Sequence, residues 1–240
     1  MIKMNRFYRM DCLEYMRALP DESVDVGIFD PPYGVDHAGN RYFDDSLRYI
    51  KTHIDEWFAE LYRVLKPGRH IYIYAPTLNL DIFIAAFKKQ FVFKNLLVAR
   101  AKTGCKQAIG AFKHDAQYVI FGSKGKPRLL KRVDIQRKSD VWMNDPRNTD
   151  PNPYSYLYSS FLDDRANAEV KNHPNAKNVM QIRKFILLSS NPGEVVLDPF
   201  AGGGAVARAA IAEGRNYYTC DLVDYGINEE ATRRTKGKAA

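Results

Sequence analysis

The stretch FDPPYG, residues 29–34, places a carboxylate, two prolines and a tyrosine directly after VDVGI, in which apolar residues alternate with Asp25 and Gly27. Proline has no backbone N–H and holds φ at about −65°, so a sheet ladder has to stop at Pro31. The backbone between Asp30 and Tyr33 is therefore rigid and mainly accepts hydrogen bonds. This arrangement would hold a hydrogen-bond donor in a fixed place, although a stiff turn after a strand has the same features.

A second candidate site is VVLDPFAGGGAVARAAIAEG, residues 195–214. It predicts a strand, a glycine loop and a helix, and Gly202 and Gly204 would let a ligand approach the backbone closely. Cofactors of open α/β sheets bind at this place, beyond the carboxyl end of a strand. The spacing Gly202-x-Gly204-x-x-Ala207 also fits a dinucleotide fingerprint, and Asp221 follows at a distance suited to gripping ribose hydroxyls. A plain strand-to-helix turn remains the alternative.

Charge separates a nicotinamide dinucleotide from S-adenosylmethionine as the ligand of this glycine loop. Asp198 stands at the mouth of the loop, where it would repel a diphosphate. S-adenosylmethionine has no phosphate and carries a cationic sulfonium and an ammonium group, which suit an aspartate. Only 36 residues follow Gly204, too few for a conventional dinucleotide half-domain. The other strands must come from upstream, which predicts a permuted chain order.

Strands alternate with helices along most of the chain. This alternation predicts an α/β domain with a largely parallel sheet that is covered on both faces. Between residues 123 and 172 the pattern fails, and we interpret that stretch as an irregular, surface-exposed insertion. The predicted strands cover residues 5–11, 23–30, 69–75, 91–100, 116–123, 194–198 and 215–221, and the predicted helices cover 12–19, 47–68, 80–90, 178–190 and 205–213.

Length and composition suit one globular domain, with or without an insertion, because the chain has 240 residues of which 45% are hydrophobic. No apolar run approaches the roughly 18 residues that span a bilayer, and the N-terminus lacks a signal-peptide core. We therefore expect a soluble, cytoplasmic protein without a membrane partner. Cys12, Cys105 and Cys220 form no CxxC pair and the five histidines are scattered, so we expect no metal site.

The net charge of +8 is concentrated in one segment, residues 100–138. This segment has 11 Lys and Arg residues against two aspartates, whereas the other 201 residues sum to −1. A basic stripe on a neutral body is the electrostatic pattern expected for nucleic acid, although a solvated basic face without a partner looks the same. The candidate phosphate contacts are Lys102, Lys106, Lys113, Lys124, Lys126 and Arg128.

With DPPY early, DPFAGGG late and an irregular insertion between them, the chain resembles the β-class amino-methyltransferases of DNA. The resemblance covers nearly the whole chain and includes MDCLEYMRALPDESVDVGIFDPPYG, RVLKPG, HDAQYVIFGSKG and NPGEVVLDPFAGGGAVARAAIAEGRNYYTCDL. It implies a Rossmann-like, S-adenosylmethionine-dependent methyltransferase fold. The implied parts are a catalytic half at 1–122, an inserted target-recognition region at 123–172, a cofactor-binding half at 173–230 and a flexible basic tail at 231–240.

The activity implied by the resemblance is site-specific methylation of adenine N6 in double-stranded DNA, with S-adenosylmethionine as methyl donor. Asp30 and the carbonyl of Pro31 would accept the two amine hydrogens and aim the nitrogen lone pair at the methyl group. Pro32 would keep these acceptors rigid, Tyr33 would stack on the flipped base, and Asp30 could take the released proton. Members of this family often pair, so a homodimer is an expectation.

The resemblance also implies the cofactor residues. Asp198, Phe200 and the glycines would form the methionine side of the pocket, Asp221 would hold the ribose, and Asp11 would reach the adenine amine. Two segments depart from the family pattern: HPNAKN replaces the usual His-Pro-Thr-Gln-Lys-Pro, and the glycine loop lacks the common Ser and Thr. The full predicted set is Asp11, Cys12, His173, Lys177, Asp198, Pro199, Phe200, Gly202, Gly204, Asp221 and Leu222.

Several alternatives stay open at this point. Transfer to cytosine N4 is the nearest, although that branch usually has Ser in place of Asp30. Methylation of RNA or of a protein glutamine usually uses a tetrapeptide that begins with Asn. A nicotinamide oxidoreductase is opposed by Asp198, and a catalytically weakened DNA-binding relative is supported by HPNAKN. The insertion, with Trp142, Tyr154, Tyr156 and Tyr158, would read bases or form its own small core.

Overall fold

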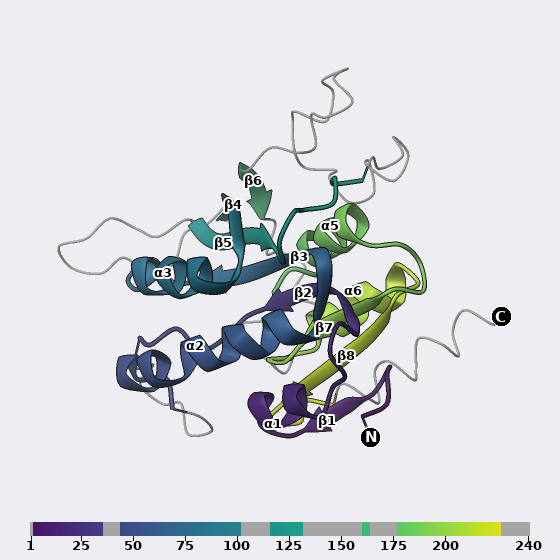
Figure 1. The fold of residues 1–240 in the computed structure, drawn as a ribbon, viewed down its shortest axis with the longest axis horizontal. Helices are drawn as coiled ribbons and strands as arrows, with labels where there is room; N and C mark the ends of the chain where they lie inside the picture. The colour runs from purple at the N-terminus through teal and green to yellow at the C-terminus, as the bar shows by residue number, and fades with distance from the viewer. Residues whose placement is uncertain (1, 36–43, 102–115, 132–159, 164–176, 227–240) are drawn as a thin grey trace, which may run out of the picture.

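The computed structural model describes residues 2–35, 44–101, 116–131, 160–163 and 177–226. At its centre is one eight-stranded sheet with the order β1-β8-β7-β2-β3-β5-β4-β6 (Figure 1). The strands are β1 (Phe7–Arg9), β2 (Val24–Phe29), β3 (Leu65–Ala75), β4 (Val92–Ala101), β5 (Ala116–Ser123), β6 (Ser160–Asp163), β7 (Val195–Asp198) and β8 (Asn216–Asp221). The helices are α1 (Cys12–Arg17), α2 (Leu47–Val64), α3 (Leu80–Gln90), α5 (Val179–Ser189) and α6 (Ala205–Ala212).

Every strand pairing in the sheet is parallel except the two that β5 makes with β3 and β4. The strands other than β5 therefore end at the same side of the sheet, which we call the carboxyl edge. The opposite side, where β2, β3 and β7 begin, is the amino edge. This mostly parallel α/β sheet confirms the predicted fold class.

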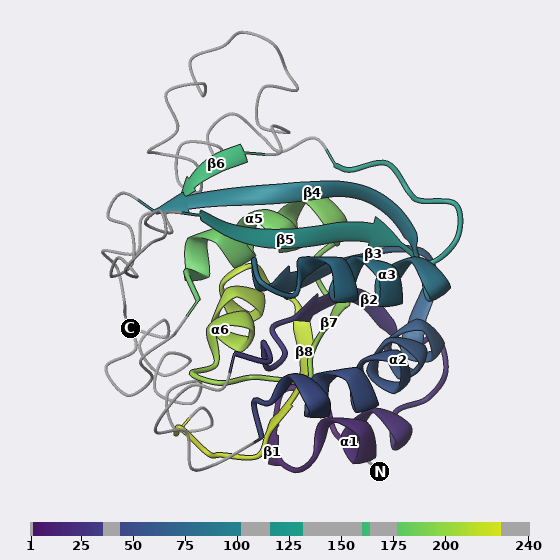
Figure 2. The same cartoon turned by 90° about the vertical axis from the view of Figure 1, so that its left-hand side faces the viewer.

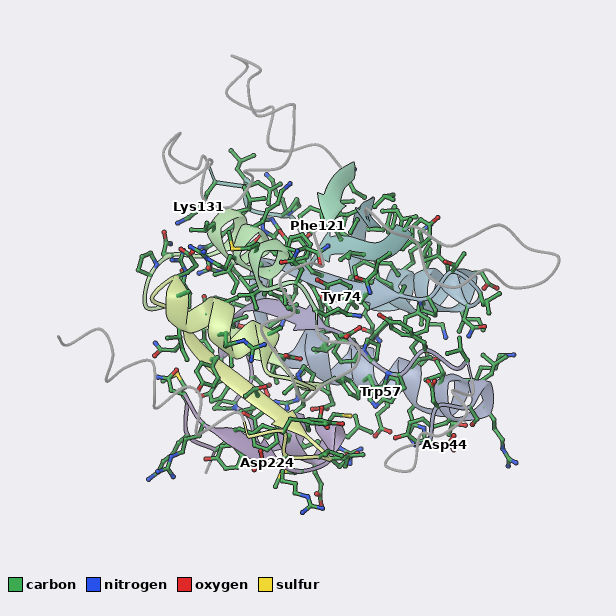
Figure 3. All side chains as sticks on the ribbon, turned by 180° about the vertical axis from the view of Figure 1, so that it is seen from behind. Asp44, Trp57, Tyr74, Phe121, Lys131 and Asp224 are labelled. Carbon is green, nitrogen blue, oxygen red and sulfur yellow. The ribbon has the colours of Figure 1, made fainter. Side chains whose placement is uncertain are left out.

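Helices cover both faces of the sheet (Figure 2). On one face α1, α2 and α3 pack around a cluster that includes the fully buried Trp57, Phe58 and Phe87. Trp57 is labelled in Figure 3. On the other face α5 and α6 pack around a cluster that includes Phe185 and Ala209. Strand β2 lies between the two clusters, and all six of its residues are buried, as expected for a central parallel strand.

The order of the chain reverses at the centre of the sheet, where β7 pairs directly with the much earlier β2. Helix α2 follows β2 on one face, whereas α6 follows β7 on the other face. Connections that leave neighbouring strands toward opposite faces open a crevice at their carboxyl ends, which is the usual ligand site of such sheets. The predicted permuted order is thus observed.

Several element boundaries differ from those expected from the sequence: β1 and α1 are shorter, and β3 begins at Leu65 rather than at residue 69. Helix α2 ends at Val64 and not at the Pro-Gly pair of residues 67–68, because Pro67 disfavours helical backbone before it and Leu65 already pairs with Val24. Strand β6 lies inside the stretch predicted to be irregular and pairs in parallel with β4. The domain boundaries remain predictions. Among the described residues, no helix is long and apolar enough to cross a membrane.

Candidate active site

Four neighbouring strands have an aspartate at or just beyond their carboxyl end. Asp11 stands two residues after the end of β1, β8 ends at Asp221, β7 ends at Asp198, and Asp30 directly follows β2. These four strands are adjacent in the sheet in that order, so the four carboxylates follow one edge. Within the described part of the chain, no lysine or arginine forms an ion pair with the first three.

The loop that follows β2, residues 30–34, is held by two side chains from other elements. Asp45 accepts hydrogen bonds from the backbone amides of Tyr33, at 2.7 Å, and Gly34, at 2.9 Å. Asn79 donates to the carbonyl of Tyr33 at 2.8 Å. Gly34 has a φ of 69°, and a Cβ there would lie 3.1 Å from Ile50 and Asn79. The loop is therefore fixed in a conformation that glycine favours.

The sequence did not identify Asp45 and Asn79 as residues that hold this loop. Each stands next to the start of a helix, α2 or α3, which is a common place for a polar cap. That signal could have marked both residues, but it could not show that they hold a loop 11 to 46 residues earlier in the chain.

The glycine loop after β7 is shaped by its own backbone and by Asp221. Gly202 and Gly204 have positive φ angles of 46° and 76°, which side chains disfavour, and α6 begins directly afterwards. The Gly202 amide donates to Oδ2 of Asp221 at 2.8 Å, while Ala201 donates to the carbonyl of Cys220 at 2.9 Å. The predicted ribose ligand Asp221 thus orders the glycine loop.

Asp198 lies in the interior of the site, with 3% of its surface exposed. Its Oδ1 accepts a hydrogen bond from the amide of Phe200 at 3.1 Å. Burial raises the pKa of Asp198 well above its ordinary value, and the negative charges of Asp30 and Asp221 add to the rise, whereas the bond from Phe200 opposes it. A cation bound here would relieve this electrostatic cost.

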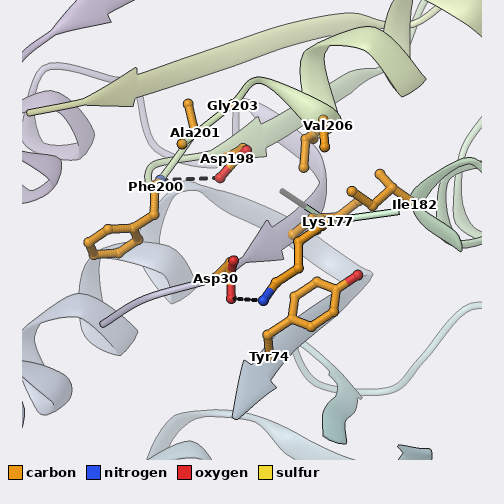
Figure 4. A pocket seen from close by; sticks show the side chains of 12 residues that line it. Asp30, Tyr74, Lys177, Ile182, Asp198, Phe200, Ala201, Gly203 and Val206 are labelled. Atoms are coloured by element: carbon orange, nitrogen blue, oxygen red, sulfur yellow. Dashed lines mark hydrogen bonds and ion pairs between the residues drawn. The ribbon is translucent and has the colours of Figure 1, made fainter. Parts of the chain in front are cut away.

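One pocket is lined by residues of both motifs (Figure 4). Asp30 comes from the end of β2, and Asp198, Phe200 and Gly202 come from β7 and the glycine loop. Phe200 packs edge-on against Phe29, with ring centroids 4.8 Å apart, so the two loops also share a core contact. The structure therefore brings the two predicted motifs together at the switch point between β2 and β7.

Lys177, which was predicted to hold the cofactor, lines the pocket and also contacts the loop of residues 30–34. Its Nζ is 2.9 Å from Oδ1 of Asp30 and donates to the hydroxyl of Tyr33 at 2.8 Å. The Tyr33 hydroxyl in turn donates to Oδ1 of Asp30 at 2.7 Å. Burial, and then the charge of Asp30, raise the pKa of Tyr33 well above its ordinary value, so this tyrosine remains a neutral donor.

The remaining cofactor candidates have mixed positions. Asp11 caps α1 by accepting from the amides of Leu13 and Glu14. Cys12 is buried, and burial raises the pKa of its thiol. The carbonyl of Pro199 accepts a bond from the thiol of Cys220 at 3.4 Å, and Leu222 is exposed after β8. His173 lies outside the described residues.

The structure separates three of the predicted DNA contacts from the pocket. Lys124, Lys126 and Arg128 follow β5, and the backbone of Lys124 and Arg128 bonds to Gly68 in the first half of β3, so they lie toward the amino edge. Lys124 is also engaged: its side chain is 11% exposed and pairs with Glu22 at 3.2 Å. Lys102, Lys106 and Lys113, and the aromatic residues predicted to read bases, lie outside the described residues.

The charges at the carboxyl edge fit a cationic ligand better than a phosphate. Asp30 and Asp198 line the pocket, and Lys177, the one cation among its described lining residues, already pairs with Asp30. A diphosphate needs free amides and cations, whereas a sulfonium or ammonium group needs unmatched carboxylates. The open backbone of the glycine loop gives such a ligand room to approach.

Comparison with known proteins is consistent with this geometry. A family model described as DNA methylase, for N6 and N4 methyltransferases, matches residues 24–231. The chain is 30% identical to "Putative methylase YubD" of Escherichia coli K12 over 92% of its length and 86% of that protein. It is 29% identical to the DNA adenine methyltransferase YhdJ of the same organism, over 88% and 76%. The solved structure of TTHA0409 from Thermus thermophilus has the same fold, with a TM-score of 0.68 and 21% identity over 97% and 95% of the chains.

Proposed function

The chain belongs to the family of N6/N4 DNA methylases, and we propose that it transfers a methyl group from S-adenosylmethionine to N6 of adenine in double-stranded DNA. The observation that carries this proposal is the shared pocket, in which Asp30 faces Asp198 and the glycine loop. The name of the relative YhdJ, a DNA adenine methyltransferase, supports adenine as the target.

The residues of the pocket suit S-adenosylmethionine. Asp198 and Asp221 supply negative charge without a paired lysine or arginine in the described part of the chain, and Gly202 leaves the loop backbone accessible. When bound, this cofactor supplies an activated methyl group on a cationic sulfur. Asp198 would face its charged methionine end, Asp221 its ribose, and Phe200 would cover its apolar surface.

Asp30 performs the chemistry on the target base. The exocyclic amine of adenine is a poor nucleophile, because its lone pair is delocalised into the ring. Asp30 and the carbonyl of Pro31 accept the two amine hydrogens and favour a pyramidal nitrogen, which is catalysis by positioning and fixed dipoles. Asp45 and Asn79 keep the loop still while this occurs. The base must leave the duplex first, which costs a few kcal/mol.

The test is product analysis with a matched pair of variants. Purified protein, S-adenosylmethionine and double-stranded DNA are incubated, and the DNA is digested to nucleosides for mass spectrometry. We expect N6-methyldeoxyadenosine from the native protein and from Asp81→Ala, an exposed control, but not from Asp30→Ala. N4-methyldeoxycytidine would assign the cytosine branch, and binding of DNA without any methylated base would assign a weakened relative.

Two finer expectations accompany the proposal. Many members of this family pair, so we expect a homodimer, which light scattering of the purified protein would test. DNA as substrate also fits a cytoplasmic location. Both expectations come from the family, and the proposed reaction requires neither of them.

A further inference from the structure

Every hydrogen bond that the Asp30 side chain makes to a described residue ends on Oδ1. Tyr33 donates to this oxygen at 2.7 Å. The Lys177 ammonium lies 2.9 Å from the same oxygen, and Figure 4 marks this second contact with a dashed line. Lys177 also donates to the Tyr33 hydroxyl at 2.8 Å. The three groups form a closed triangle, which fixes the rotation of the carboxylate and assigns one oxygen to the protein itself.

Lys177 is held in this place from several directions. Its side chain is 13% exposed, and its ammonium lies 4.8 Å from the ring centre of Tyr74 and 5.2 Å from that of Tyr33. The next residue, Asn178, caps α5 by accepting from the amide of Met180 at 2.9 Å, so the backbone beside Lys177 is fixed. The hydroxyl of Tyr74 donates to Gln181 of α5, which ties that helix to β3.

The contact between Lys177 and Asp30 also affects the distribution of charge in the pocket. Asp30 and Asp198 line the same pocket, and the negative charge of Asp30 adds to the rise in the pKa of Asp198. The charged or titratable groups that face Asp30 are Asp198 from β7, Tyr74 from β3, Tyr33 from its own loop and Lys177 from the start of α5. Lys177 is the cation among these described groups, and its contact with Asp30 is a charge-assisted hydrogen bond, which is stronger than a neutral one.

We propose that Lys177 is a positioning residue for methyl transfer, which holds Oδ1 of Asp30 together with Tyr33, so that Oδ2, to which no described residue donates a hydrogen bond, is left for the target amine. This inference rests on the proposed function. Asp30 remains the catalytic residue, and Lys177 acts through it. Lys177 was assigned to the cofactor from the sequence, and the triangle gives it a different role.

Atoms and charge balance in this step. The amine nitrogen forms a bond to the methyl carbon with its lone pair, while the carbon–sulfur bond breaks and its electron pair stays on sulfur. The positive charge on nitrogen is removed when one amine proton moves to Oδ2 of Asp30. The neighbouring ammonium of Lys177 then favours release of that proton to solvent, which restores the carboxylate for the next turnover.

The experiment compares Lys177→Met and Lys177→Arg with the native protein across pH. In Lys177→Met we expect kcat to fall about 10- to 100-fold, as for the loss of a charge-assisted hydrogen bond. The Michaelis constant for S-adenosylmethionine should stay within severalfold, so that the loss is confined to kcat. Lys177→Arg should recover most of kcat at each pH, because it keeps a cationic donor beside Asp30. Lys89→Met, which removes an exposed pair with Asp55, is the matched control and should change neither.

A second measurement needs no catalysis. Urea unfolding of the protein without ligands, for Lys177→Met, Asp30→Asn and the double variant, should show non-additive effects if the two side chains are coupled. An unchanged kcat, a faster Lys177→Met enzyme or additive unfolding would each overturn the proposal, and a faster variant would mean that Lys177 blocks the amine site. Absence of methylation by the native protein would instead contradict the proposed function, while the unfolding cycle would still report on the contact.

Discussion

The two edges of the sheet use their charged residues in opposite ways. At the amino edge the carboxylate of Asp25, 1% exposed, is surrounded by Arg69 at 2.7 Å, Lys66 at 2.9 Å and the amide of Val195 at 3.0 Å. Arg69 continues to Glu194 at 2.6 Å. These charges satisfy one another, and they join the beginnings of β2, β3 and β7.

At the carboxyl edge, by contrast, Asp198 is equally buried but receives only a backbone amide among the described residues. The difference is visible in the pKa values. Burial alone would raise the pKa of Glu194, but hydrogen bonds from Arg69 and Asn191 outweigh it and lower the pKa to about 2. The pKa of Asp198 moves the other way. Paired charges hold the fold, and buried charges without a protein partner mark a place for a ligand.

The largest expected effect is at Asp30. Asp30→Ala should lower the rate of methyl transfer about a thousandfold or more, because it removes both the amine acceptor and the proton acceptor. Affinity for S-adenosylmethionine should change by less than severalfold, since the glycine loop and Asp198 remain. Single-turnover kinetics and calorimetry measure the two quantities. Normal turnover in this variant would refute the role of Asp30.

The second effect concerns the amino edge and appears in stability. Folding lowers the pKa of Glu194 from 4.5 to about 2. Such a group stabilises the folded protein at pH values above 4.5, and this contribution is lost as the pH falls toward about 2. Glu194→Gln should therefore reduce the free energy of unfolding at pH 7 by about 2 kcal/mol. The difference from the native protein should vanish near pH 2.

Urea unfolding between pH 2 and pH 7 measures this difference, and Asp55→Asn serves as the control because its pair with Lys89 is exposed. A constant difference across this range would show that Glu194 stabilises by packing and not by charge. Methyl transfer by the folded Glu194→Gln enzyme should equal that of the native protein.

The third effect concerns Asp198, where one substitution should change both cofactor affinity and stability. Burial raises the pKa of Asp198, and a cationic cofactor binds its ionised form better. Affinity for the cofactor should therefore rise with pH as Asp198 loses its proton. Asp198→Asn should weaken binding by at least about tenfold and flatten this pH dependence. The same variant without ligand should be no less stable than the native protein at neutral pH, because a buried charge has been removed. A loss of stability without a change in affinity would place Asp198 among the structural charges.

Most of the helices and strands, and the two aspartates of the pocket, could be predicted from the sequence. The strands and helices followed from hydrophobic periodicity, and Asp30 and Asp198 stood out because each ends a buried strand. Strand β6 could not be predicted, because four residues inside an irregular stretch become a strand only by pairing with the distant β4. For the same reason, the sequence could not show that Lys177 contacts a loop 144 residues earlier. Local pattern determines the elements, but such contacts depend on how the elements pack.

The smallest expected effect is on DNA binding, which tests whether the amino edge of the sheet also contacts DNA. Lys126 and Arg128 are exposed at the amino edge, away from Asp30, whereas the basic stripe in the sequence predicted phosphate contacts there. Each lost phosphate contact reduces the slope of log affinity against log salt by about 0.9. Because these two side chains lie at the edge whose charges serve the fold, Lys126→Gln with Arg128→Gln should leave the slope unchanged. A reduction of about two would mean that DNA also covers the amino edge, and the division between the two edges would then apply to catalysis but not to binding.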